Sequence, residues 1–458
     1  MARLSFMKKL TAPGSYLHET FLEDSDGCAK GRQCILVGTL SASIITSLTA
    51  GIYFTSLMLA MGASETYIGY VTAIISFSGL FQLFAPLLLE KLPRRKELLL
   101  AARSIYYLLD IVAMGVIPLL PIGHALKLVL FMVTLVLLHA INYIATPGIS
   151  AWHMQSLPMT KRVNFYTISN VGTTILNQIS AFLAGLLLDH FEANTLSFRS
   201  MSPTMTAIII LRLVALLFAV LECRKYACVK EFPYEADPSM HTEKGIRLLM
   251  QPLKDKLFMR TIFIPVAWTF ITGIVGQYFS IYLLEDVKMS YSLIALGGFI
   301  STPITVLSTP LWYRTIRKLS WPKVLAIGQL GNMLAYFCNA LITRQTQAFY
   351  FLCIILGSCF GTCINIVHSN LVYLHMPTSN RTSYFSFYSI LTLLASFLGV
   401  YFGILFITLT NGIPFPFLGF YMGNKQYINL VSVLLYFVLS LFTLSYCRRK
   451  EHNISVVF

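Results

Sequence analysis

Long runs of apolar residues, separated by short polar stretches, repeat along the whole chain. A helix needs about 20 apolar residues to cross the hydrocarbon core of a bilayer, and its backbone polar groups must be satisfied within the segment. We place the runs at Leu36–Met61, Glu65–Leu89, Glu97–Leu119, Leu126–Gly148, Val163–Leu188, Thr204–Leu221, Phe258–Leu284, Leu293–Tyr313, Val324–Ile342, Ala348–Val372, Ser383–Leu409 and Tyr427–Tyr446. The pattern predicts an all-α integral membrane protein with about twelve transmembrane helices.

The composition supports a lipid environment. Apolar residues make up 56% of the 458 positions and charged residues 12%, whereas a soluble domain is typically about 25% charged. A water-soluble fold could not bury this much apolar surface, so membrane lipids are the expected surroundings of most of the chain.

The basic residues explain the formal charge of +15 and predict the orientation. Lys and Arg are retained on the cytoplasmic side of a membrane. With the N-terminus taken as cytoplasmic, 27 of them fall in cytoplasmic segments, 5 in the opposite loops and 2 within spans. We therefore expect a multi-pass protein of the cell membrane with both termini cytoplasmic, and no nucleic acid as partner.

The chain divides into two similar halves. We expect a cytoplasmic tail over 1–35, a six-helix bundle over 36–221, a proline-containing cytoplasmic linker over 222–257, a second bundle over 258–446 and a tail over 447–458. Arg162 and Arg381 both lie just before a span and are 219 positions apart. Internal duplication of spans is common in secondary transporters, so the two bundles are predicted to be pseudo-symmetric.

The six plus six spans, the long central loop and the cytoplasmic ends resemble the major facilitator superfamily over nearly the whole chain. The loop after the second span is similar to the family's signature. Glu90 stands at the place of its aspartate, Lys91, Arg94 and Arg95 stand at its basic positions, and prolines replace its two glycines. The resemblance implies a cytoplasmic gate at these four residues. The alternative is that the bases only set the topology.

Polar residues form matching stripes on two spans. The fourth span carries His139, Asn142, Thr146, Ser150 and His153, and the tenth carries Ser358, Thr362, Asn365 and Ser369. Steps of three and four place each set on one helix face, and the resemblance implies that the first, fourth, seventh and tenth spans line a central cavity. The predicted substrate-binding residues are His139, Asn142, Thr146, Trp268, Thr272, Thr362 and Asn365. For the hydroxyls, close helix packing is the competing explanation.

Asp110 is the one acid that this pattern places deep inside a span, and Arg212 lies at similar depth in the sixth. A charge at the centre of a bilayer costs about 2.5–3.5 kcal/mol on insertion scales. We expect a buried, structural Asp110–Arg212 pair. Coupling of a proton to transport is the alternative role of Asp110.

Chemistry beyond transport has little support in the sequence. No His/Asp/Ser cluster, glycine-rich phosphate loop or paired cysteine spacing is present, so no catalytic residues, metal site or cofactor are expected. The residues of the predicted cavity favour a neutral or weakly charged small solute, moved by alternating access in a secondary active transporter. A drug or amphiphile efflux permease is one alternative, although the fifth span lacks the Gly-Pro pair usual in the family's drug antiporters. A sensor or membrane enzyme on a transporter-like core is the other.

Overall fold

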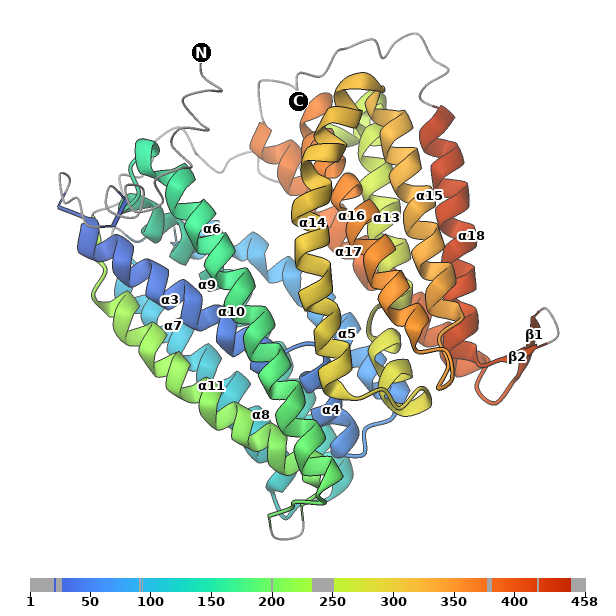
Figure 1. Ribbon diagram of the computed structural model, residues 1–458. Helices are drawn as coiled ribbons and strands as arrows, with labels where there is room; N and C mark the ends of the chain where they lie inside the picture. The colour runs from blue at the N-terminus through green and yellow to red at the C-terminus, as the bar shows by residue number, and fades with distance from the viewer. Residues whose placement is uncertain are drawn as a thin grey trace. The chain divides into compact units, whose positions relative to one another are not determined.

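The computed structural model describes residues 20–21, 27–89, 92, 94–198, 201–232, 251–376, 381–417 and 420–445, most of which are helical (Figure 1). Within them, ten helices are long and apolar enough to cross a membrane, and the bent pair α3 (Ala29–Thr49) and α4 (Ile52–Ala60) makes an eleventh. Another helix, α15 (Trp321–Ala340), lies at the ninth predicted span. The all-α integral membrane fold is confirmed, and the exact number of twelve spans stays a prediction.

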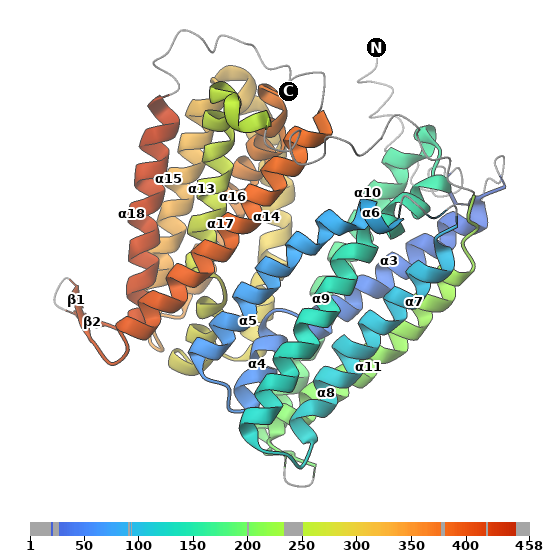
Figure 2. The same cartoon turned by 180° about the vertical axis from the view of Figure 1, so that it is seen from behind.

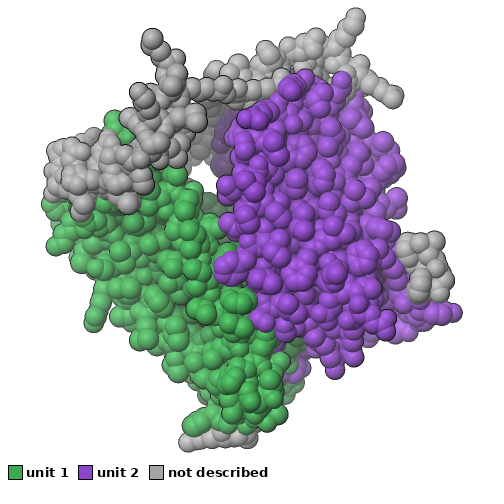
Figure 3. Space-filling view, viewed as in Figure 1, with its two compact units in different colours: residues 1–61, 78–239 green, residues 62–77, 240–458 purple. Residues whose placement is uncertain are grey.

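The described helices form two compact units, coloured separately in Figure 3. Unit 1 covers residues 1–61 and 78–239. Besides α3 and α4 it contains η2 (Gly79–Leu83), α6 (Phe84–Leu89), α7 (Lys96–Tyr107), η3 (Leu108–Ala113), α8 (Met114–Val116), η4 (Ile117–Leu119), α9 (His124–Gln155), α10 (Met159–Ala193) and α11 (Pro203–Ala227). Helix α3 packs against α10 and α11, and α7 packs against α9.

Unit 2 covers residues 62–77 and 240–458. Its described elements are α5 (Glu65–Ser78), η5 (Gln251–Lys254), α13 (Lys256–Ile281), η6 (Tyr282–Asp286), α14 (Tyr291–Lys318), α15, α16 (Ala348–Leu374), α17 (Arg381–Leu409), the strands β1 (Phe415–Phe417) and β2 (Phe420–Met422), and α18 (Asn424–Ser445). The two strands pair antiparallel. Helix α5, part of the second predicted span, lies beside α17 (Figure 2), where the Ser76 and Ser396 hydroxyls are 3.2 Å apart. The predicted domain boundaries stay a prediction, and 233–250 of the predicted linker lie outside the described residues.

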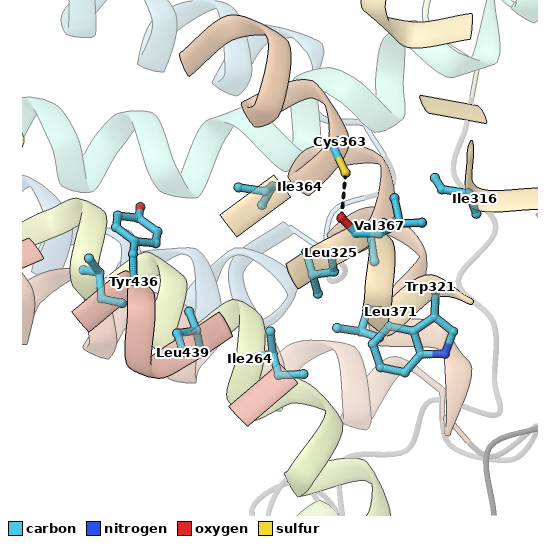
Figure 4. Packing of buried hydrophobic residues seen from close by; sticks show 12 residues of the cluster. Ile264, Ile316, Trp321, Leu325, Cys363, Ile364, Val367, Leu371, Tyr436 and Leu439 are labelled. Atoms are coloured by element: carbon cyan, nitrogen blue, oxygen red, sulfur yellow. Dashed lines mark hydrogen bonds between the residues drawn. The ribbon is translucent and has the colours of Figure 1, made fainter. Parts of the chain in front are cut away.

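The core of unit 2 gathers large apolar side chains from several helices (Figure 4). Leu325 of α15, Val367 of α16 and Leu439 of α18 are almost fully buried there. The thiol of Cys363 donates a hydrogen bond to the main-chain oxygen of Val324 at 3.4 Å, which ties α16 to α15. This packing holds one face of α16 fixed, and the remainder of that helix carries the predicted polar stripe.

Helix starts follow ordinary capping chemistry. The side chain of Ser202 accepts a hydrogen bond from the Met205 amide at the start of α11. At the start of α13, the carboxylate of Asp255 accepts from the Leu257 and Phe258 amides at 3.1 and 3.0 Å. Such caps satisfy amides that have no partner within the helix, so the first residues of these spans are set by local sequence.

Helix interruptions are set by backbone geometry. Gly51, with a φ of 60°, separates α3 from α4, and Gly276, with a φ of 21°, bends α13 near its end. Positive φ is a conformation that glycine reaches at little cost. Two π-helical turns, η3 and η6, interrupt the third and seventh spans. The apolar pattern predicts these spans as continuous helices, because hydropathy carries no signal for a change in backbone hydrogen bonding.

Candidate functional site

A cavity of about 390 Å³ lies within unit 2 between α13, α16 and α17; we call it the aromatic cavity. Its lining residues are Pro265, Trp268, Thr269, Asn365, His368, Ser369, Val372, Tyr373, Phe385 and Tyr388. Two predicted substrate-binding residues, Trp268 and Asn365, are among them. The lining contains aromatic rings, hydroxyls, one amide and one imidazole, and no acidic or basic side chain other than that histidine.

The rings of Trp268 and His368 lie against each other in the lining of this cavity. Their ring centroids are 5.3 Å apart, with the rings nearly perpendicular at 78°. His368 is 8% exposed, and neither its Nε2 nor the Nε1 of Trp268 has a hydrogen-bond partner within the described residues. Buried polar atoms are normally hydrogen-bonded, so these two nitrogens are groups that a bound solute could satisfy.

Close helix packing positions the walls of the aromatic cavity. A Cβ atom at Gly399 of α17 would overlap the main-chain oxygen of Phe270 on α13, and one at Gly403 would overlap that of Ile274. Glycine therefore allows the two backbones to approach, as is usual between membrane helices. The distance between Trp268 on α13 and Tyr388 on α17 depends on this crossing.

The other two predicted substrate-binding residues of the second half, Thr362 and Thr272, do not line the aromatic cavity. Thr362 lines a separate crevice of about 470 Å³ between α14, α15 and α16, and Asn365 contributes to both spaces. Thr272 lines neither, and its hydroxyl donates to the Thr269 oxygen at 2.9 Å. This oxygen belongs to the main chain one turn back on the same helix, so the Thr272 hydroxyl is satisfied within α13.

In unit 1, the predicted residues of α9 meet a charged network. The Arg103 guanidinium donates to the side-chain oxygen of Asn142 at 3.2 Å, and the Thr146 hydroxyl contacts that oxygen at the same distance. Arg103 also forms an ion pair with Glu222, Nε to Oε1, at 2.9 Å. The Tyr107 hydroxyl donates to the other carboxylate oxygen. Asn142 is thus held in place by protein groups.

Glu222 corrects the sequence interpretation, which treated Asp110 as the one acid deep inside a span and placed residue 222 in the linker. Helix α11 continues to Ala227, six residues past the predicted end at Leu221, and Glu222 is fully buried. The apolar run stops at Leu221, but helical hydrogen bonding does not. Arg103, which lies within the third predicted span, is the sequence signal that pointed to an acid nearby.

His139, the remaining predicted residue of α9, is partly buried. Its ring centroid lies 6.0 Å from that of Tyr143, and its Nδ1 has no hydrogen-bond partner within the described residues. His139 thus resembles His368 of unit 2 in carrying a buried imidazole nitrogen that has no hydrogen-bond partner within the described residues.

Asp110 and Arg212 are in contact, through the main chain. Arg212 donates from Nη1 to the main-chain oxygen of Asp110, and lies 3.5 Å from that of Ile111. The Asp110 carboxylate accepts from the Thr49 hydroxyl at 3.4 Å. Both charged residues are buried, and the contact joins η3 to α11 and α3.

The predicted gate lies partly outside the described residues, which include Arg94 and Arg95 but not Glu90 and Lys91. Arg94 is exposed. The main-chain amides of Arg95 and Lys96 both donate to the Glu231 carboxylate, the second at 2.9 Å. An acid at the start of α7 is stabilised by the helix dipole. Glu231 falls in the predicted linker, so the described part of the gate is attached to the linker.

A second polar site, which the sequence did not indicate, lies in unit 2. The Lys425 ammonium forms ion pairs with Glu65 and, at 2.7 Å, with Asp286. It thereby connects the starts of α5 and α18 to the end of η6. Lys425 and Asp286 also line a cavity of about 500 Å³.

Comparison with known proteins agrees with this architecture. The sequence profile of the Major Facilitator Superfamily matches residues 35–400. The crystal structure of a mutant of the nucleoside transporter NupG has a TM-score of 0.66 at 14% identity, covering 91% of this chain and 99% of that one. The structure of a bacterial metal transporter has a TM-score of 0.66 at 13% identity, covering 92% of this chain and 99% of that one. The structure of an auto-inhibited POT family peptide transporter has a TM-score of 0.65 at 12% identity, covering 92% of this chain and 97% of that one. The chain matches no curated protein sequence. The profile match spans far more than half of the chain, and this protein therefore belongs to the major facilitator superfamily.

Proposed function

We propose that this protein is a secondary active transporter that moves a neutral or weakly charged small solute, and that the aromatic cavity is part of its binding site. The observation that carries the proposal is the pair of Trp268 and His368, which line a cavity without carboxylates, lysines or arginines and whose Nε1 and Nε2 atoms have no hydrogen-bond partner within the described residues. Such a lining recognises a solute by ring stacking and hydrogen bonds.

A solute with a ring and several polar groups fits this lining best. Aromatic side chains bind flat or ring-shaped molecules through their faces, while Asn365 and Ser369 offer amide and hydroxyl groups. A nucleoside or a sugar has both features. The nucleoside specificity of NupG belongs to that protein, and at 14% identity it supports only the shared fold.

Alternating access is the proposed mechanism, with the two halves moving around the predicted polar stripes. In this proposal both termini lie in the cytoplasm of a cell, and Glu90, Lys91, Arg94 and Arg95 form the cytoplasmic gate. Glu231 supports the gate role, because its carboxylate holds the amides of Arg95 and Lys96. Movement of the linker that carries Glu231 would then be transmitted directly to the start of α7.

Ligand-induced stabilisation of the purified protein tests the binding site. A ligand at a hundredfold excess over its dissociation constant stabilises the folded state by about 2.7 kcal/mol. Among neutral nucleosides and sugars, we expect at least one to raise the melting temperature, and we expect Trp268→Phe and Asn365→Ala to abolish that rise.

Trp312→Phe is the matched control, since the Trp312 indole donates to the Cys359 oxygen at 2.8 Å and does not line the aromatic cavity. It should keep the full ligand-induced rise. A rise that survives both Trp268→Phe and Asn365→Ala would place the binding site elsewhere.

A further inference from the structure

The crevice between α14, α15 and α16 has a different character from the aromatic cavity, and we call it the lateral crevice. Figure 1 shows α16 between α14 and α15, and the 470 Å³ space lies among these three helices. Next to its lining residues, Val306 of α14 and Leu334 of α15 are 65% and 49% exposed. Exposed apolar side chains on a membrane helix are suited to contact with lipid, and an opening of the crevice beside them would lead towards hydrocarbon.

The interior of the lateral crevice is polar. Asn339, near the end of α15, is 9% exposed, and its side-chain oxygen has no hydrogen-bond partner within the described residues. Asn332, two turns earlier on the same helix, is equally buried and also lines the space. Polar side chains inside a membrane normally face a partner, so the oxygen of Asn339 is a group that a hydrogen-bonding ligand in the crevice could satisfy.

Hydroxyl groups extend this polar lining towards the middle of the bundle. The Ser358 hydroxyl donates to that of Ser301 at 2.8 Å, and the Thr362 hydroxyl donates to the main-chain oxygen of Ser358 at 2.6 Å. The crevice has no Asp, Glu, Lys, Arg or His among its lining residues. Its chemistry therefore suits hydroxyl and amide groups and offers nothing to neutralise a charge.

Two glycines of α16 leave the floor of the crevice open. A Cβ atom at Gly361 would meet no atom within 4 Å, and one at Gly357 would approach only the Ala335 side chain, at 3.9 Å. By contrast, the ring of Phe360 occupies the space that a Cβ atom at Gly331 of α15 would need. Packing does not require glycine at 357 and 361, and a larger side chain at either position would occupy the crevice.

We propose that the lateral crevice binds a neutral lipid whose headgroup carries hydroxyl or amide groups, with its acyl chain passing between α14 and α15 into the bilayer. A lipid reaches this position from within the membrane, and its headgroup supplies a donor to Asn339 and partners for the hydroxyls. The site is separate from the aromatic cavity, although Asn365 touches both, and the proposal does not depend on which solute is transported.

Photo-labelling in nanodiscs tests the proposal, with a diazirine-tagged monoacylglycerol as the probe. We expect the label on peptides of α14 to α16. Gly361→Leu, which fills the floor, should abolish most of that labelling, and Asn339→Leu should lower it about fivefold, the factor that corresponds to one lost hydrogen bond.

The control Leu217→Phe adds bulk at an exposed position of α11, in unit 1, and should leave labelling unchanged. Each variant is compared only after size-exclusion and melting measurements show the wild-type fold. Labelling that persists in both Gly361→Leu and Asn339→Leu would overturn the proposal. Equal labelling by an anionic phosphatidylglycerol probe, or full competition by free glycerol, would also overturn it, because the site would then recognise charge or a soluble polyol.

Discussion

Arg103 and Glu222 place opposite charges where helices α7 and α11 of unit 1 meet, with the Glu222 side chain fully buried and that of Arg103 18% exposed. Removing one partner of a buried ion pair leaves an uncompensated charge and costs about 3–5 kcal/mol. We expect Glu222→Gln to lower the melting temperature strongly, and the double variant Arg103→Gln/Glu222→Gln to recover part of the loss. Glu97→Gln, at an exposed position of α7, is the control. If Glu222→Gln melts at the same temperature as the wild type, the Arg103–Glu222 ion pair does not have a structural role.

Variants of Asp110 and Arg212 distinguish a structural role of this pair from a role in proton coupling. Arg212 donates to the Asp110 main-chain oxygen, a bond that Arg212→Gln removes and Asp110→Asn retains. We therefore expect both variants to melt below wild type, Arg212→Gln by the larger amount, because it also leaves a buried carbonyl unsatisfied. Two wild-type melting temperatures would contradict the structural role. A stable Asp110→Asn variant that binds solute but no longer accumulates it would instead favour proton coupling.

Sequence periodicity identifies a site residue when other polar residues lie on the same face of its helix. Asn365 was predicted from the polar stripe of the tenth span and Trp268 from the seventh span that the family resemblance places at the cavity, and both line the aromatic cavity. His368 was not predicted, because it lies near the end of the tenth predicted span, a position typical of the membrane interface, whereas in the structure it packs against Trp268 and is buried. The partners of Asn142 and Asp110 depend on which helices meet, and a single helical stripe does not contain that information.

At the level of the helices, the contact between α13 and α17 depends on glycine. Because a Cβ at Gly399 would overlap the Phe270 oxygen, Gly399→Ala must push the helices apart, and overpacking of this kind costs about 1–3 kcal/mol. We expect a lower melting temperature and weaker solute binding, since α13 and α17 both line the aromatic cavity. Gly361→Ala is the matched control, because it adds the same methyl group into open space. Equal effects of the two substitutions would argue against a specific contact.

Apolar runs predicted the helices well because lipid imposes a length on each of them. The interruptions at Gly51, Gly276, η3 and η6 were not predicted, since they reflect local backbone geometry. Hydropathy also leaves helix partners undetermined: in lipid, both the packed and the exposed faces of a span are apolar. Helix α5 groups with unit 2 rather than with the other helices of its half. The apolar pattern of the sequence does not predict this grouping.

For the whole molecule, the proposed mechanism requires the cytoplasmic ends of the two halves to separate and close during each cycle. In a variant whose native cysteines are replaced, we would introduce Thr160→Cys after the fourth predicted span and Ser379→Cys after the tenth. A short, cleavable cross-linker between them should stop solute uptake into proteoliposomes, and cleavage of the linker should restore it. Each single-cysteine variant, treated in the same way, controls for modification alone. Uptake that continues at the wild-type rate in the fully cross-linked protein would rule out alternating access by movement of the two halves, and would leave only paths that open within one half.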